Sequence, residues 1–123
     1  MINAGAGGRC GAVSDPSPSG PAFGNDGLVT AVVQDAASGD VLMVAYMDSA
    51  AWEATRRSGE VHFWSRSRQR LWRKGETSGN VLRVREVRLD CDADAVLLRV
   101  DPAGPACHTG ERSCFFTTVP PAP

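Results

Sequence analysis

Six short segments rich in apolar and β-branched residues run through this chain, and they restrict its possible folds more than any other feature. Turn-forming residues separate them, and one further segment has a helix-forming composition. This pattern is typical of β-strands joined by short loops. The predicted strands are 28–34, 41–46, 60–64, 81–91, 95–100 and 113–119. The sequence therefore predicts an α+β fold, predominantly β, in one small domain with one short helix.

Turn and capping residues predict how the first elements are joined. Turn-forming residues at 37–40 connect the first two predicted strands, so these strands are expected to form a hairpin. Asp48 is a favourable N-cap for a helix over 50–57, and Gly59 stands where a C-terminal cap is expected. The order of the strands in the sheet does not follow from this pattern.

The termini and the net charge limit the classes of protein to which the chain can belong. Residues 1–24 lack the basic start and continuous apolar region of a signal peptide. We expect a disordered leader over 1–24, a folded domain over 25–119, a tail over 120–123 and a cytoplasmic location. No apolar run approaches the roughly 20 residues that span a membrane. A net charge of -1 argues against a nucleic-acid-binding protein.

Three of the four cysteines lie close to one of the two histidines and to a run of alternating aspartates. The cysteines are Cys91, Cys107 and Cys114, and the histidine is His108. In a chain without a signal peptide, such cysteines indicate a metal or catalysis rather than disulfides. Thiolates and imidazole are ligands for zinc-like metals. Cys10 lies in the leader and is expected to be a bystander.

Three interpretations of the thiols remain open from the residues alone. A catalytic zinc site keeps three protein ligands and one open position, whereas a structural site has four. Because His108 directly follows Cys107, the two side chains of an extended backbone would point apart. We therefore favour an open site with His108 beside the metal as a general acid/base. A structural site closed by His108 and buried thiols without metal are the alternatives.

The alternating aspartates Asp90, Asp92 and Asp94 suggest a second metal. Strands 81–91 and 95–100 are expected to pair through a tight turn here, with the three carboxylates on one face. Their mutual repulsion would be relieved by a cation, and oxygen ligands favour Mg²⁺. A solvated acidic turn is the alternative.

Segment 65–80 holds four arginines and the only lysine of the chain, followed by small polar residues. A solvated charged loop is one interpretation. A phosphate site is the other, because guanidinium groups bind phosphate in a bidentate manner and glycine-rich backbone exposes N–H groups to oxyanions. A tryptophan beside these cations is suited to stacking on a purine.

Four blocks of this sequence resemble the phosphoribosyl-AMP cyclohydrolase family of histidine biosynthesis. They are GLVTAVVQD with VLMVAYM, HFWSRSRQRLWRKGETSGN, LDCDADAVLLRV and GPACHTGERSCFF. The resemblance extends from about residue 27 to residue 116. Thr30 departs from it, because the family often has proline there. We expect no fused phosphoribosyl-ATP pyrophosphatase domain, since the chain stops shortly after Cys114.

The resemblance implies an obligate homodimer of small, twisted, mixed-sheet domains. It implies zinc held by Cys91 of one subunit and by Cys107 and Cys114 of the other, with Mg²⁺ on the three aspartates. The implied reaction is hydrolysis of the N1–C6 bond of the purine ring in 1-(5-phosphoribosyl)-AMP. A structural zinc module without catalysis is the alternative function.

The implied substrate carries two phosphates and a purine, which matches the composition of segment 65–80. We therefore predict substrate contacts within this segment and the strand before it. They are Trp64, Arg66, Arg68, Trp72, Lys74, Glu76, Thr77 and Ser78.

Overall fold

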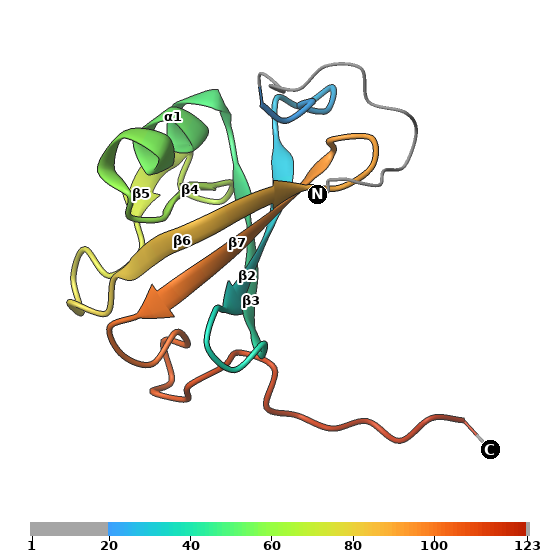
Figure 1. Ribbon diagram of the computed structural model, residues 1–123, viewed down its shortest axis with the longest axis vertical. Coiled ribbons are helices and arrows are strands. Elements are labelled where there is room, and N and C mark those ends of the chain that lie inside the picture. Colours follow the sequence, from blue (N-terminus) through green and yellow to red (C-terminus); the bar gives the residue numbers. More distant parts are fainter. Residues whose placement is uncertain (1–19, 123) are drawn as a thin grey trace.

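The computed structural model describes residues 20–122, which form one mixed sheet, one helix and a two-stranded hairpin (Figure 1). The sheet has the strand order β3-β2-β7-β6, in which β2 and β7 are parallel and the other pairs antiparallel. The predominantly β architecture with one short helix is thus confirmed. The elements are β2 (Val29–Asp35), β3 (Val41–Met47), α1 (Ser49–Ser58), β4 (His62–Ser65), β5 (Arg70–Arg73), β6 (Leu82–Leu89) and β7 (Ala95–Pro102).

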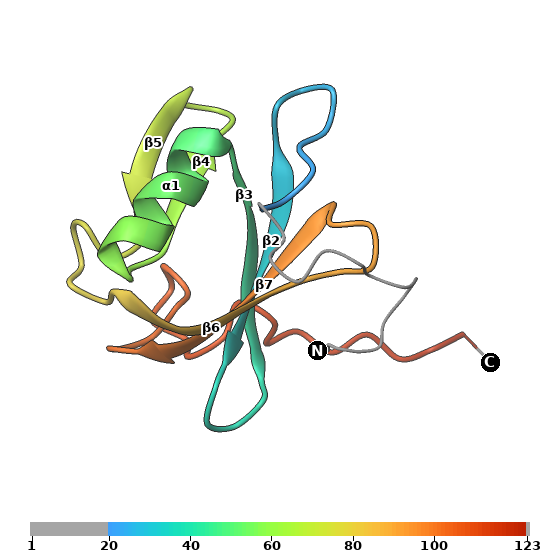
Figure 2. The same ribbon diagram turned by 45° about the horizontal axis from the view of Figure 1, so that its top comes forward.

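The core lies on one face of the sheet, because alternate residues of β2 and β7 are buried. Val33 of β2 pairs with Met43 of β3 and with Leu98 of β7, so three apolar side chains meet there. Figure 2 shows α1 and the β4–β5 hairpin together on one side of the sheet, and Trp52 and Phe63 bring their apolar surface into this core. Burial of apolar surface between these layers is the main force that holds them together.

Helix α1 begins and ends as its sequence predicts. The carboxylate of Asp48 accepts a hydrogen bond of 2.8 Å from the Ala51 N–H. Gly59 adopts a left-handed conformation, and its N–H bonds the Thr55 carbonyl. The buried Thr55 hydroxyl accepts a 2.9 Å bond from the His62 N–H, which fastens the helix to β4. The predicted β2–β3 hairpin and the β6–β7 pair are also confirmed.

The prediction of a last strand over 113–119 is wrong. This segment has no strand conformation and contacts the sheet through Ser113 and Cys114, whose hydroxyl and N–H bond the carbonyls of Val41 and Leu42. Phe115 remains 63% exposed, so the apolar residues that suggested a strand do not enter the core. Apolar composition alone does not make a strand where no ladder of hydrogen bonds is available.

Strand β5 was not predicted, because its residues lie within the basic segment. It pairs antiparallel with β4, and the pairing places Phe63 opposite Trp72, with ring centroids 5.2 Å apart. The hairpin is stabilised by this aromatic contact and by backbone hydrogen bonds. The middle of the basic segment is therefore a strand rather than a loop.

The described part of the chain begins before the predicted domain boundary. Residues 20–24 of the expected leader lie against the sheet, with a 2.7 Å hydrogen bond from the Ala22 N–H to the Ala93 carbonyl and with Phe23 packed on the core. The remainder of that leader, including Cys10, lies outside the described residues. Within residues 20–122, the one helix is too short to cross a bilayer.

Candidate active site

A cavity of about 490 Å³ lies between the β5 region and the loop that follows β7. It brings Cys107 and His108 to the basic segment, although these parts lie about thirty residues apart in the chain. Most of the predicted substrate contacts line it. These are Arg68, Trp72, Lys74, Glu76, Thr77 and Ser78.

Trp64 and Arg66 do not lie in this cavity. They line a separate depression beside the start of α1, where the guanidinium of Arg66 lies 4.1 Å from the centroid of the Tyr46 ring. The strand register explains the difference, because neighbouring residues of β4 face opposite sides. Trp64 is paired with Leu71, whereas its neighbour Phe63 is paired with Trp72.

The structure adds cavity residues that sequence reasoning did not name as contacts. They are Ser65, Arg70, Arg73, Pro105 and Gly110. Alternation within β5 is the sequence signal that groups Arg70 with Trp72 on one face. Nothing in the sequence alone indicated that Pro105 would face the basic segment.

Glu76 organises the basic segment. Its carboxylate accepts hydrogen bonds from the Arg70 guanidinium at 3.0 Å and from the Arg73 N–H at 3.1 Å, and these bonds lower the pKa of Glu76. The Arg73 guanidinium is engaged by Glu60 at 2.9 Å. Among the ion pairs of residues 20–122, none involves the cavity cations Arg68 and Lys74.

Two glycines allow the walls of the cavity to approach one another. Gly75 has a φ of 87°, and a Cβ there would lie 2.5 Å from backbone atoms of Asn80 and Val81. A Cβ on Gly104 would collide with the Asn80 side chain. The turn after β5 therefore closes on itself at Gly75, which only glycine permits there, and the Asn80 side chain lies against Gly104 of the loop that carries Cys107.

Cys107 and Cys114 lie together beside the cavity. The Thr109 hydroxyl donates a 3.0 Å hydrogen bond to the Cys107 sulfur and lowers the pKa of that thiol. Partial desolvation of the thiol raises the pKa of Cys114, and the adjacent Cys107 raises it further. The positive charge of Lys74 adds to the lowering of the Cys107 pKa and offsets a small part of the rise in the Cys114 pKa. Two adjacent sulfur donors, one of them easily ionised, suit zinc.

Cys91 lies at the other end of the molecule. It belongs to the turn between β6 and β7, whereas Cys107 follows the far end of β7 (Figure 1). The eight residues of β7 extend over about 25 Å between these two places. One chain therefore brings two of the three predicted zinc ligands together and keeps the third away.

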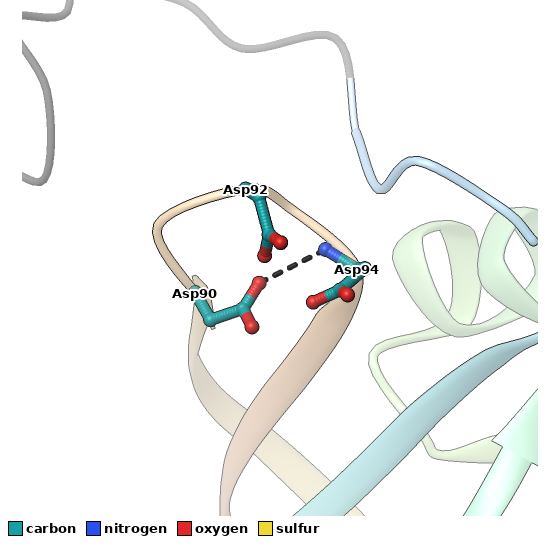
Figure 3. A group of neighbouring side chains, drawn as sticks. All are labelled: Asp90, Asp92 and Asp94. Atoms are coloured by element: carbon teal, nitrogen blue, oxygen red, sulfur yellow. Dashed lines mark hydrogen bonds between the residues drawn. The ribbon is translucent and has the colours of Figure 1, made fainter.

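The three aspartates gather in the turn beside Cys91, as Figure 3 shows. One oxygen from each of Asp90, Asp92 and Asp94 lies within 4.8 Å of the others, and all three residues are exposed. The Asp90 carboxylate accepts a 2.9 Å bond from the Asp94 N–H, and Ala93 has a φ of 63°. The expectation of a shared strand face is wrong, because a tight turn brings the carboxylates together.

The close approach of these carboxylates shifts the pKa values of Asp92 and Asp94 in opposite directions. Asp92, followed by Asp90, raises the pKa of Asp94 to about 6. The hydrogen bond with Asp94 lowers the pKa of Asp92. Like charges at such distances favour sharing a proton or binding a cation. The oxygen donors of the turn suit a hard ion such as Mg²⁺.

Comparison with known proteins identifies the family. Residues 43–116 match the family model "Phosphoribosyl-AMP cyclohydrolase", and this range contains every predicted site residue. The chain is 65% identical to the "Phosphoribosyl-AMP cyclohydrolase" of Sphingopyxis alaskensis over 80% of its own length and 79% of that protein. It is 57% identical to the protein of the same name from Methanosarcina mazei, over 79% of this chain and 84% of that one. The chain belongs to the phosphoribosyl-AMP cyclohydrolase family.

Proposed function

We propose that this protein is the phosphoribosyl-AMP cyclohydrolase of histidine biosynthesis, a hydrolase that acts on carbon–nitrogen bonds in cyclic amidines. Its substrate is 1-(5-phosphoribosyl)-AMP, and the bond that it breaks joins N1 and C6 of the purine ring. One observation carries this proposal: the cavity joins a basic, tryptophan-containing wall to Cys107 and His108, in a chain of this family.

The basic wall is suited to the two phosphates of this substrate. Glu76 and Glu60 form ion pairs with the two other arginines of the cavity, whereas Arg68 and Lys74 remain available to bind phosphate. Thr77 and Ser78 of the turn after β5 line the same cavity, and their hydroxyl groups are suited to donate hydrogen bonds to these anions. Trp72 lines the cavity between these groups and presents an aromatic surface for the purine.

The thiols fit zinc, which in this proposal is held by Cys107 and Cys114 together with Cys91 of a second copy of the chain. The separation of Cys91 from the other two cysteines along β7 supports this sharing in a homodimer. Exposed Phe115 and Phe116, next to Cys114, are the kind of apolar surface that a partner covers. Zinc, when bound, lowers the pKa of water towards 7 and so supplies a nucleophile for the electron-poor C6.

In this proposal, His108 donates the proton that the leaving N1 atom requires. It lines the cavity immediately after Cys107. Water adds to C6, the C6–N1 bond breaks, and N1 must gain a proton as it leaves. An imidazole can both take up and release a proton, so His108 is suited to give that proton to N1 as a general acid.

The acidic turn holds Mg²⁺ in the same arrangement. Asp90, Asp92 and Asp94 flank Cys91, so a second copy that presents Cys91 also presents these carboxylates to the cavity. A magnesium ion there would help to neutralise the substrate phosphates.

The test is to incubate purified protein with 1-(5-phosphoribosyl)-AMP, with zinc and magnesium supplied, and to follow ring opening by ultraviolet absorbance. Turnover that a zinc chelator abolishes and added zinc restores is expected. Absence of turnover under these conditions would contradict the proposal. A structural zinc module, the alternative, binds zinc without turnover and does not depend on Lys74.

A further inference from the structure

The guanidinium of Arg112 joins the loop that carries the two adjacent thiols to the turn between β2 and β3. Its Nη1 donates to Asp40 Oδ2 at 2.6 Å, and its Nη2 donates to Asp35 Oδ2 and Ser38 Oγ, each at 2.7 Å. Three acceptors from one turn thus hold one side chain. A planar group with several N–H donors is required for this geometry, which favours arginine over lysine.

Asp35 strengthens this contact, because its side chain is only 11% exposed and has little access to water. Its Oδ1 accepts hydrogen bonds from the Ala37 and Ser38 N–H groups, and its Oδ2 receives Arg112. The Ala37 N–H bond and the Arg112 contacts lower the pKa of Asp35 despite desolvation. A buried carboxylate left without its cation would be strongly destabilising. The guanidinium is therefore held firmly in place.

The backbone of the same residue fixes the loop from within. The Arg112 carbonyl accepts a 3.1 Å hydrogen bond from the Ala106 N–H, which closes the loop around Cys107. Two residues further on, the Cys114 N–H donates a 2.7 Å bond to the Leu42 carbonyl of β3. Arg112 therefore closes the loop through its carbonyl and joins it to the β2–β3 turn through its side chain, and Cys114 makes a separate bond to β3.

We propose that Arg112, held by Asp35 and Asp40, is a positioning residue for the metal-binding thiols of Cys107 and Cys114. This inference rests on the zinc site of the proposed function. Without the Arg112 side chain, the bonds of Ser113 and Cys114 to β3 remain, but the part of the loop before them loses its tie to the β2–β3 turn. That part must then be ordered when zinc binds, and the entropy lost in ordering it weakens binding. Groups that orient metal ligands without touching the metal commonly contribute about 10- to 100-fold to metal affinity.

The experiment compares zinc binding by full-length wild-type protein with that by Arg112→Ala and Arg112→Lys. A chromophoric chelator withdraws zinc from each loaded protein, and cobalt replaces zinc in parallel samples to report thiolate-to-metal absorption. Arg112→Ala is expected to bind zinc about 10- to 100-fold more weakly, with a weaker thiolate band. Arg112→Lys, which keeps the charge, is expected to fall between. Arg56→Ala is the matched control, because Arg56 makes an exposed ion pair with Glu53 on α1.

Each possible result either supports or contradicts the proposed role of Arg112. Wild-type zinc affinity and an unchanged cobalt spectrum in Arg112→Ala would overturn it, even if that variant unfolds at a lower temperature. If Arg112→Ala does not fold, Asp40→Asn removes the exposed arm of the anchor, since Asp40 is 59% exposed. A several-fold loss of zinc affinity in Asp40→Asn is then expected, and unchanged affinity overturns the inference. Wild-type protein that binds no zinc would refute the zinc site itself, and this failure is visible before any variant is compared.

Discussion

At the scale of single residues, Lys74 differs from Arg70 and Arg73 of the cavity because no carboxylate engages it among the ion pairs of residues 20–122. A hydrogen bond from such a group to a phosphate contributes about 1.5–3 kcal/mol. Lys74→Met is therefore expected to lower kcat/KM about 10- to 100-fold, mainly through a higher KM. Arg57→Met, which removes an exposed cation from α1, is the control and should leave both constants unchanged. Steady-state kinetics measure both constants, and an unaltered KM in Lys74→Met would contradict the assignment of this residue to the phosphate site.

A substitution of Asp92 distinguishes the proposed magnesium site from the proposed zinc site. Asp92→Asn removes one anionic oxygen from the three that gather in the turn, so the Mg²⁺ concentration that gives half-maximal activity should rise several-fold. Bound zinc should stay the same, because thiolates and carboxylates favour different metals. Magnesium titration of activity and zinc analysis of the same sample measure both. An unchanged magnesium curve would count against a carboxylate site.

At the scale of elements, the turn after β5 offers two glycines that differ in their surroundings. Gly75 and Gly79 have similar positive φ angles, 87° and 82°, but a Cβ meets backbone atoms at 2.5 Å only at Gly75. Gly79→Ala should cost about 1 kcal/mol, the usual penalty for a left-handed alanine. Gly75→Ala should cost clearly more and should raise KM as well, because the turn cannot close.

Urea unfolding of the two variants measures the difference in free energy of unfolding. Gly79→Ala is the matched control, since it carries the same conformational penalty without the collision. Equal losses of stability in both variants would mean that the approach of Gly75 to residues 80 and 81 does not matter.

The elements that could be predicted are those that local chemistry determines. Asp48 and Gly59 define the ends of α1 through bonds to nearby residues, and both could be identified from the sequence. Segment 113–119 and β5 could not, because a strand depends on its partner. Phe115 lacks a paired strand among the described residues and stays exposed, whereas Trp72 of β5 pairs with Phe63.

The candidate site was predictable in composition but not in assembly. The sequence identified the thiols, His108 and the basic segment, and the structure places most of them around one cavity. The strand register, which places Trp72 in that cavity and Trp64 outside it, depends on tertiary pairing. The anchoring role of Arg112 was likewise hidden, since its partner Asp35 lies 77 residues away in sequence.

At the scale of the whole molecule, the residues of the proposed active site lie in two groups at opposite ends of β7. The cavity with Cys107 and His108 lies beyond one end of β7, and the turn with Cys91 and the three aspartates lies at the other. In the proposed function, the site beside the basic wall therefore takes its third thiolate from a second copy of the chain. The proposed zinc site, magnesium site and homodimer all depend on this division.

Complementation between two inactive variants tests this shared site most directly. Cys91→Ser keeps Cys107 and Cys114, and Cys107→Ser keeps Cys91, so each variant alone should lack zinc and nearly all activity. When the two are unfolded and refolded together, random pairing makes about half of the dimers mixed, and each mixed dimer has one intact site. Ring-opening activity should then return to roughly a quarter of the wild-type value. A well-refolded mixture that stays as inactive as its parents would contradict the shared site and mean that each chain builds its own.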